Sequence, residues 1–449
     1  MDMADLFSAA SNGDCVKIRS LLDEGMDVGA KDGDGFTALH HAAKAGHCPA
    51  MGMLLDRGAD IEATGKSDLT TGKTGLTVLH LATMNNNCAA IAILLARGAN
   101  LEKRNKFDQT ALHFAASRGD CDLVGLLSHD QSPIGNFNRM DKNLLSALQH
   151  SSMSTRTEGS RCDAITLLLD GGADIDARDC FDYTPLHYAA LEGNNNAILL
   201  LLDRGADLSN EYGQPVLHKA ALGGHNDTVN LLLDHGVDIA AEDDVGGTAL
   251  HIAARYGHPE TVRLLCSRGA DLAATDEYGE MTPLLDAAMN GHCNVIDVAL
   301  SLGATLAETD VLGDTALHMA VTSGGLDTVA HLIGLGVEVN GRNIHGATAL
   351  HNAVYWKLCS LKMAEALLFA GTDCNLKDEK GRTLYDVAPD GTGMQEFLLN
   401  HQKHHHPYLK KLCRAKILSI LGKSGQEESE IHQFAIPQDL KDYLLFRAI

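Results

Sequence analysis

Residues 245–277 read VGGTALHIAARYGHPETVRLLCSRGADLAATDE, and this stretch decides the fold. Thr248 is expected to cap a helix, because its side-chain oxygen can accept from backbone N–H groups left free in the first turn. The helix itself, Ala249 to Tyr256, is short and rich in alanine, so a neighbouring helix can approach it closely. Gly257 can take the left-handed conformation that ends a helix.

A second helix is expected from about Pro259. It carries one apolar stripe, made of Val262, Leu264 and Leu265. Gly269 ends this helix, and the following Ala-Asp-Leu begins an extended loop that leads into the next repeat. One helix pair of this size cannot bury its own apolar face, whereas a stack of such pairs can.

The same short sequence motifs recur along the chain. Thr-x-Leu-His begins at Thr37, Thr77, Thr110, Thr184, Thr248, Thr315 and Thr348. With the following Gly-His and the Leu-Leu-x-x-Gly-Ala-Asp ending, these words resemble the ankyrin repeat over roughly residues 5 to 400. The resemblance implies an all-α fold, an ankyrin-repeat solenoid of about 12 helix-turn-helix repeats with β-hairpin loops.

The array is expected to span residues 1–402, with degenerate first and last repeats, and residues 403–449 to form a linker and a second module. Insertions interrupt it near residues 65–74 and 130–160. The first contains Gly72-Lys73-Thr74, as a phosphate-binding loop would, but Ser67 stands where that motif needs a glycine. An elongated hairpin tip is therefore the prediction here. The second is either a functional protrusion or a tolerated surface loop.

Composition excludes several classes of function. The net charge is −23, and because residues 401–449 hold 8 Lys and Arg against 5 Asp and Glu, a net of +3, the remainder carries −26. Such charge argues against nucleic acid or an anionic membrane as the main partner. The 11 cysteines include no C-x-x-C pair, so neither a disulfide framework nor a zinc site is expected. Without a signal peptide or a membrane-spanning stretch, we expect a cytoplasmic protein, with the nucleus also open.

No group of residues predicts catalysis. The Thr-x-Leu-His histidines share one structural position, where ankyrin-like repeats use the imidazole to hydrogen-bond neighbouring turns. The run His404 to His406 is interpreted as a linker, since three adjacent residues on an extended chain cannot all face one ion. With no nucleophile, base and oxyanion-hole constellation, we expect no enzyme activity, no metal and no cofactor.

The C-terminal residues form a separate amphipathic pattern. After Pro407, Leu409, Cys413 and Ile417 recur at i, i+4 and i+8, and Leu412 adds further apolar surface. This spacing and the pair Cys413-Arg414 resemble the elongin-binding helix of a SOCS box. The resemblance implies that Leu409, Leu412, Cys413 and Ile417 bind elongin C.

The downstream residues continue this resemblance. Phe434-Ala435-Ile436-Pro437 stands where the SOCS box family has a Leu-Pro-Φ-Pro segment, and the helical ending Leu-Lys-Asp-Tyr-Leu-Leu-Phe follows from Leu440. Ile436, Pro437 and Leu440 are the implied cullin contacts. Ala435 replaces the first proline of the family pattern.

Ankyrin repeats followed by a SOCS box resemble the ankyrin-repeat and SOCS-box family. That resemblance implies a non-catalytic substrate receptor of a cullin-RING ubiquitin ligase, working with elongins B and C, a cullin (cullin-5 is expected) and its RING subunit. The target protein is not identifiable from the sequence. The alternative is an ankyrin scaffold or adaptor whose C-terminal helices only cap the stack.

A target-binding surface is predicted from aromatic residues at the hairpin tips. The residue just before the turn glycine or aspartate is aromatic in four repeats, at Phe107, Phe181, Tyr212 and Tyr278. Exposed aromatic side chains are common anchors for a bound protein. Local packing between adjacent hairpins is an equally open interpretation.

Overall fold

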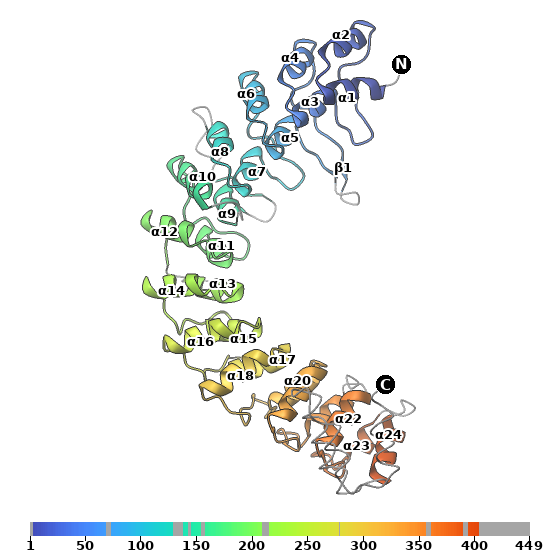
Figure 1. Cartoon of the computed structure of the whole chain (residues 1–449), viewed down its shortest axis with the longest axis vertical. Helices are drawn as coiled ribbons and strands as arrows, with labels where there is room; N and C mark the ends of the chain where they lie inside the picture. The colour runs from blue at the N-terminus through green and yellow to red at the C-terminus, as the bar shows by residue number, and fades with distance from the viewer. Residues whose placement is uncertain are drawn as a thin grey trace, which may run out of the picture. The chain divides into compact units, whose positions relative to one another are not determined.

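A computed structural model describes residues 3–68, 73–128, 138–141, 145–153, 158–208, 215–277, 279–355, 361–388 and 394–403. Over these residues the chain forms a succession of helix pairs joined by hairpin loops (Figure 1). It divides into two compact units, Met1–Asp244 and Val245–Ile449. The predicted boundary between the repeat array and the C-terminal module, 402/403, stays a prediction, because residues 404–449 lie outside the described residues.

The helices of the first unit are α1 (Met3–Asn12), α2 (Cys15–Asp23), α3 (Ala38–Ala45), α4 (Cys48–Asp56), α5 (Val78–Met84), α6 (Cys88–Ala96), α7 (Ala111–Ser117), α8 (Cys121–Leu127), α9 (Ala147–Ser152), α10 (Glu158–Asp170), α11 (Pro185–Leu191), α12 (Asn195–Asp203), α13 (Val216–Gly223) and α14 (Asn226–Asp234). The helices of the second unit are α15 (Ala249–Arg255), α16 (Pro259–Ser267), α17 (Pro283–Asn290), α18 (Cys293–Leu302), α19 (Ala316–Thr322), α20 (Leu326–Gly334), α21 (Ala349–Tyr355), α22 (Leu361–Phe369), α23 (Leu384–Val387) and α24 (Met394–Lys403). We number the repeats by these pairs, so that repeat 1 is α1 with α2 and repeat 12 is α23 with α24. The described residues thus form 12 pairs, which confirms the predicted ankyrin-repeat solenoid.

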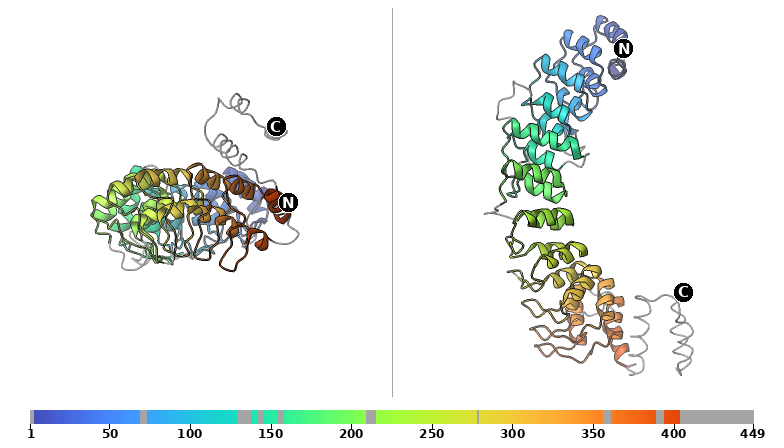
Figure 2. Two further views of the ribbon diagram at one scale, coloured as in Figure 1. Left: turned by 90° about the horizontal axis from the view of Figure 1, so that it is seen from below. Right: turned by 60° about the vertical axis from the view of Figure 1, so that its left-hand side comes forward.

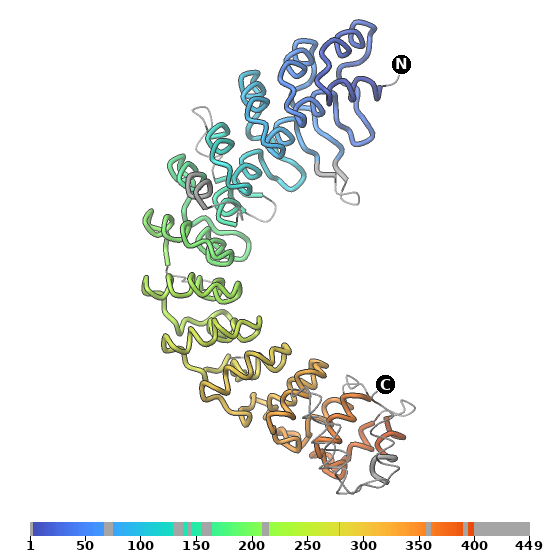
Figure 3. The backbone as a smooth tube through the Cα atoms, viewed as in Figure 1, coloured from blue at the N-terminus to red at the C-terminus, as the bar shows by residue number. Residues whose placement is uncertain are grey.

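Two layers of helices build each unit. The odd-numbered (inner) helices pack on one another, and the even-numbered (outer) helices form the second layer (Figure 1). Alanine pairs such as Ala42 and Ala43, or Ala253 and Ala254, are completely buried between inner helices. Because alanine has only a methyl side chain, successive inner helices come close together. The backbone path from inner helix to outer helix to hairpin loop can be followed in Figure 3.

Repeat 8 shows how the sequence produces one pair. Thr248 is the N-cap of α15, and Gly257, with φ of 79°, follows the helix in the left-handed conformation predicted for it. In α16, Thr261, Val262 and Leu265 are buried. Leu264 is only half-buried, so the predicted stripe was wrong at that position. An outer helix packs along a single narrow face, and Leu264 lies at its edge.

The Thr-x-Leu-His histidines are structural, as predicted. In seven repeats the threonine N–H donates to Nδ1 of the histidine three residues later, over 3.1–3.3 Å. In His80, His113, His251 and His318, Nε2 also contacts a carbonyl of the next hairpin loop, for example Gln109 for His80 and Met281 for His251, both at 3.0 Å. Because a carbonyl only accepts, the proton sits on Nε2 and the ring is neutral.

The Gly-His histidines tie each repeat to the one before it. Nε2 of His225 donates to the Leu191 carbonyl over 2.9 Å, and Nε2 of His292 donates to the Arg255 carbonyl over 2.9 Å. Imidazoles therefore link some neighbouring repeats in both directions along the chain. This is a nearest-neighbour stabilisation, as expected of a solenoid.

The insertion near residues 65–74 forms a short antiparallel hairpin, as predicted. Its strands are β1 (Ser67–Asp68) and β2 (Lys73–Thr74), with Ser67 paired to Thr74. A phosphate-binding loop needs a strand that leads through the loop into a helix; here the two sides of the loop pair with each other. Within the second insertion, near 130–160, α9 ends at Ser152 and α10 begins at Glu158.

Candidate target-binding surface

Many of the described hairpin loops are held by a carboxylate or amide at their base. In repeat 6, Oδ1 of Asp179 accepts from the N–H groups of Phe181 and Tyr183, both at 2.8 Å. The Asp179 N–H donates back to the Tyr183 carbonyl over 3.2 Å. Asx turns of this kind fix the loop locally. The tip side chains are therefore presented in a defined place.

Phe181, one of the predicted target contacts, belongs to an aromatic cluster of its own hairpin. The Phe181 ring is 67% exposed, and its centroid lies 5.9 Å from that of Tyr183. Tyr188 donates its hydroxyl to Oδ2 of Asp179 over 2.5 Å, which fixes a second ring beside Tyr183. Phe181 thus packs locally and is also exposed, so its role as a target contact stays a prediction.

Lys219, from the next repeat, completes the cluster. Its Nζ lies 3.6 Å from the centroid of the Tyr183 ring, which places a cation over the aromatic face. Burial lowers the pKa of Lys219 to about 8, against the opposing pull of Asp179 and Asp243. The contact joins repeats 6 and 7, and nothing in the sequence pattern predicted it.

Phe107, the predicted contact in repeat 4, is 38% exposed, with Nζ of Lys106 5.1 Å from its ring centroid. The structure keeps Phe107 and Phe181 in separate repeats, each with its own neighbours. The other two predicted contacts, Tyr212 and Tyr278, lie outside the described residues.

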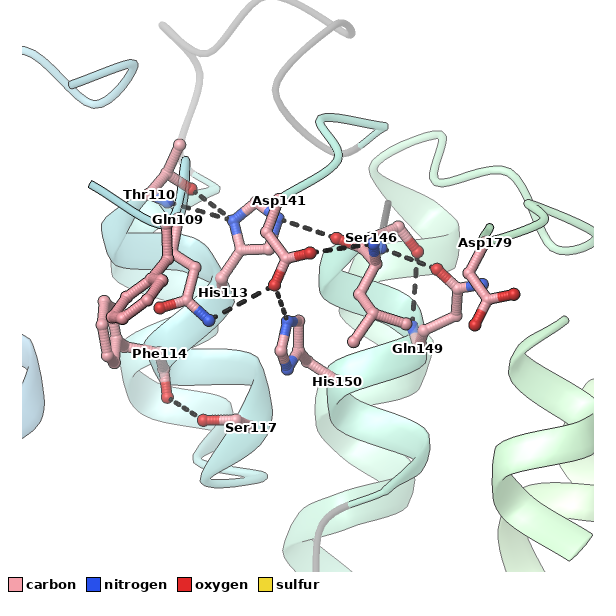
Figure 4. Close-up of polar contacts among 12 residues, drawn as sticks. Gln109, Thr110, His113, Phe114, Ser117, Asp141, Ser146, Gln149, His150 and Asp179 are labelled. Atoms are coloured by element: carbon pink, nitrogen blue, oxygen red, sulfur yellow. Dashed lines mark hydrogen bonds and ion pairs between the residues drawn. The ribbon is translucent and has the colours of Figure 1, made fainter. Parts of the chain in front are cut away.

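Between these two tips, a polar network spans repeats 4 to 6 (Figure 4). Oδ2 of the buried Asp141 accepts from the Gln109 amide at 3.3 Å and contacts Nε2 of His150 at 3.1 Å. Gln149 stands where other repeats have histidine. Its Oε1 accepts from the Ser146 N–H at 2.6 Å, and its Nε2 donates to the Tyr183 carbonyl at 2.7 Å. Glutamine therefore reproduces both contacts of the imidazole.

Repeat 9 has Thr-Pro-Leu-Leu in place of Thr-x-Leu-His, and an ion pair joins it to repeat 8 in addition to the His251 contact. Arg255 reaches Asp286 through two hydrogen bonds of 3.0 and 3.1 Å. Asp286 is only 3% exposed, and this burial raises the pKa of its carboxyl group, while Arg255 favours the charged form. A two-pronged contact of this kind links repeats 8 and 9.

The second unit exposes apolar tip residues that the sequence analysis missed. Val245 and Leu312 each precede a turn glycine, as do Tyr212 and Tyr278, and they are 37% and 43% exposed. Val311 is 50% exposed and Ile344 54%. The predicted tip residues were all aromatic. If any large apolar residue before the turn glycine were taken as a candidate contact, the sequence would also predict Val245 and Leu312.

Two further findings concern the described residues. Across the helices described, none has the length and apolar character needed to cross a membrane. Within the same part of the chain, no group of three or more His, Cys, Asp or Glu could hold a metal ion.

Comparison with protein families matches most of the chain. The family described as ankyrin repeats (3 copies) matches residues 5–65, 64–141, 133–212, 152–243, 186–276, 240–310 and 284–378. The SOCS box family matches residues 407–445.

Individual relatives cover smaller parts. Ankyrin repeat and SOCS box protein 11 of Mus musculus is 29% identical over 136 residues, which are 30% of this chain and 39% of that protein. E3 ubiquitin-protein ligase KEG of Arabidopsis thaliana is 34% identical over 82 residues, 18% of this chain and 5% of that protein. The chain therefore spans less than half the length of these curated relatives.

Among solved structures, the ankyrin repeat domain of Bcl-3 is 30% identical, with a TM-score of 0.41. The match covers 48% of this chain and 98% of that one. The family matches are the decisive finding, because the ankyrin family alone covers well over half of the sequence. The chain belongs to the ankyrin-repeat family, and it is one of the proteins that combine ankyrin repeats with a SOCS box.

Proposed function

We propose that the chain is the substrate-recognition subunit of an elongin B/C–cullin-RING E3 ubiquitin ligase. The observation that carries this proposal is the SOCS box match at residues 407–445, on the C-terminal side of ankyrin repeats matched from residue 5 to 378. Mouse ankyrin repeat and SOCS box protein 11 has both modules in its name and supports the same assignment.

The SOCS box would connect the chain to the ligase. Its first helix would insert an apolar face into elongin C, made of Leu409, Leu412, Cys413 and Ile417. Ile436, Pro437 and Leu440 would contact the cullin, with cullin-5 and its RING subunit as the expected partners. These residues lie outside the described part of the structure, so the assignment rests on their match to the family pattern.

The ankyrin array would hold the target. The hairpin tips are fixed by Asx turns and by inter-repeat hydrogen bonds, so their exposed side chains are preorganised for binding. The chain would then catalyse nothing. It would raise the effective concentration of the target near the ubiquitin-charged enzyme. We place this activity in the cytoplasm, with the nucleus as a second location.

The test is binding of purified full-length chain to purified elongin B–C, followed by size-exclusion chromatography. A stable ternary complex is the expected result. A folded chain that elutes apart from the elongins would instead favour the alternative, an ankyrin scaffold or adaptor.

A first variant concerns the cullin. Ala435→Pro is expected to strengthen cullin binding several-fold without changing elongin binding. Proline restricts the free segment before Pro437, so less conformational entropy is lost on docking, an effect of about 0.4–1 kcal/mol. Calorimetry of both forms, each bound to elongin B–C, measures the difference. Equal affinities would show that this position does not limit docking.

A second variant concerns target capture by the first unit. Phe181→Ala combined with Tyr212→Ala is expected to reduce capture at least about tenfold, since aromatic anchors often contribute 2 kcal/mol or more. Proximity labelling under proteasome inhibition compares the proteins captured by each form. Leu199→Ala is the control, because Leu199 is 39% exposed on outer helix α12 of the same repeat as Phe181. Unchanged capture by a folded double variant would remove these aromatics from the target surface.

A further inference from the structure

In the second unit, the hairpin tips of successive repeats are bonded to one another. Four backbone hydrogen bonds of 2.8–3.1 Å join them, from Glu277 to Val245, Val311 to Gly279, Ile344 to Leu312 and Glu379 to His345. The hairpin loops of this unit project side by side (Figure 2). We call these bonded tips, which include Val245, Gly279, Leu312, His345 and Glu379, the tip ladder. They form one continuous edge in which each tip is hydrogen-bonded to the next.

The tip ladder presents apolar side chains to water. Its exposed apolar members are Val245, Val311, Leu312 and Ile344, at 37%, 50%, 43% and 54%. Single exposed apolar residues are ordinary, but a row of them on one braced edge is typical of an interaction surface. Because the backbone is already ordered, a partner loses little additional conformational entropy of this chain when it binds.

Charge indicates the kind of partner. Residues 245–314 contain 10 Asp and Glu against 3 Lys and Arg. Those three basic residues lie on helices α15 and α16: Arg255 pairs with Asp286, Arg263 with Glu260, and Arg268 caps α16.

The tip segments of repeats 9 and 10 contain no basic residue at all. Segments 276–281 and 308–314 carry Asp276, Glu277, Glu280, Glu308, Asp310 and Asp314. Glu277 and Glu280 are exposed. The pKa of Asp310 is raised by burial and by the neighbouring Asp314, so a cation there would relieve repulsion between the two carboxylates. The apolar tips at Val245, Val311 and Leu312 are flanked by carboxylates, whereas Ile344 lies two residues from the exposed Arg342. The acidic part of the ladder, the tips of repeats 8 to 10, complements a partner with apolar and cationic side chains.

We propose that the tip ladder docks a short extended segment of the target that carries apolar side chains together with Lys or Arg. An extended segment fits because the exposed tips follow one another along a line, so only a chain that runs along it reaches several of them. The inference rests on the proposed function, in that the bound protein is the target of the ligase.

The experiment selects short random peptides from a display library on the purified full-length chain. Wild type is expected to enrich peptides that combine apolar residues with Lys or Arg. Leu312→Asp with Ile344→Asp should weaken binding of the selected peptides at least about tenfold, because two apolar contacts are replaced by charges. Glu277→Lys with Glu280→Lys should remove the preference for basic peptides.

Leu335→Asp is the matched control. Leu335 is 40% exposed, close to the 43% of Leu312, but it lies at the C-cap of outer helix α20. This control should bind the selected peptides as wild type does. The proposal falls if wild type enriches acidic or uncharged peptides or none, or if Leu312→Asp with Ile344→Asp binds as wild type does. It also falls if sedimentation shows that a second copy of the chain occupies the ladder. Elongin B–C binding, measured on the same preparations, reports separately on the proposed function.

Discussion

The full-length chain carrying Leu409→Glu and Cys413→Lys is expected to lose elongin B–C entirely while its ankyrin array melts as in wild type. If Leu409 fills an apolar pocket of elongin C, its burial contributes roughly 1.5–3 kcal/mol. A carboxylate in that pocket would have no partner and would cost several kcal/mol more. Since about 1.4 kcal/mol is tenfold in affinity, the loss should be about a thousandfold or larger.

A pull-down with purified elongin B–C and a circular dichroism melt together make this measurement. Lys411→Glu serves as the control, because it adds a carboxylate to the same predicted helix on the face opposite Leu409, Cys413 and Ile417. It should retain the elongins. Ankyrin stability is largely nearest-neighbour, so damage at residue 409 should leave the central repeats intact. A double variant that still binds elongin B–C would refute this assignment of the pocket residues.

Acid is expected to destabilise the array between about pH 6.5 and pH 5, above the usual pKa of carboxylates. Burial lowers the pKa of His40, His80 and His113 from 6.5 to about 4. Between these two values the unfolded chain binds protons that the folded chain does not, so the free energy of unfolding falls as the pH falls. Each such histidine should remove about 2 kcal/mol between pH 7.5 and pH 5. The three together would remove a large share of the stability of a typical domain.

Repeat 5 supplies the control for this prediction. Gln149 makes both contacts of the histidine without titrating. The variant His80→Gln with His113→Gln should therefore have near wild-type stability at pH 7.5, and its stability should fall less by pH 5. Urea titrations at both pH values give the two differences. A fall equal to that of wild type would mean that these imidazoles do not cause the acid sensitivity.

The sequence by itself determined the repeat and its internal contacts. Thr248 caps α15 and Gly257 ends it through interactions among residues a few positions apart, which any chain with this pattern would make. The hydrogen bond between the threonine N–H and the imidazole in Thr-x-Leu-His is also local, because the two residues are three positions apart. The SOCS box was also recognisable from local spacing, and the family match at residues 407–445 confirms its presence. Its individual contacts with elongin C and a cullin remain predictions.

Only the tertiary structure decided how neighbouring repeats meet. The ion pair of Arg255 with Asp286 and the stacking of Lys219 on Tyr183 join residues more than thirty positions apart. The half-burial of Leu264 and the bonded tips of Val245, Leu312 and Ile344 likewise depend on where the next repeat lies. Repetition in the sequence predicts that repeats stack. The stack brings exposed side chains of successive repeats into one row. The identity of these side chains depends on the variable positions of each repeat, and the local sequence of one repeat does not predict which residue the next repeat places beside it.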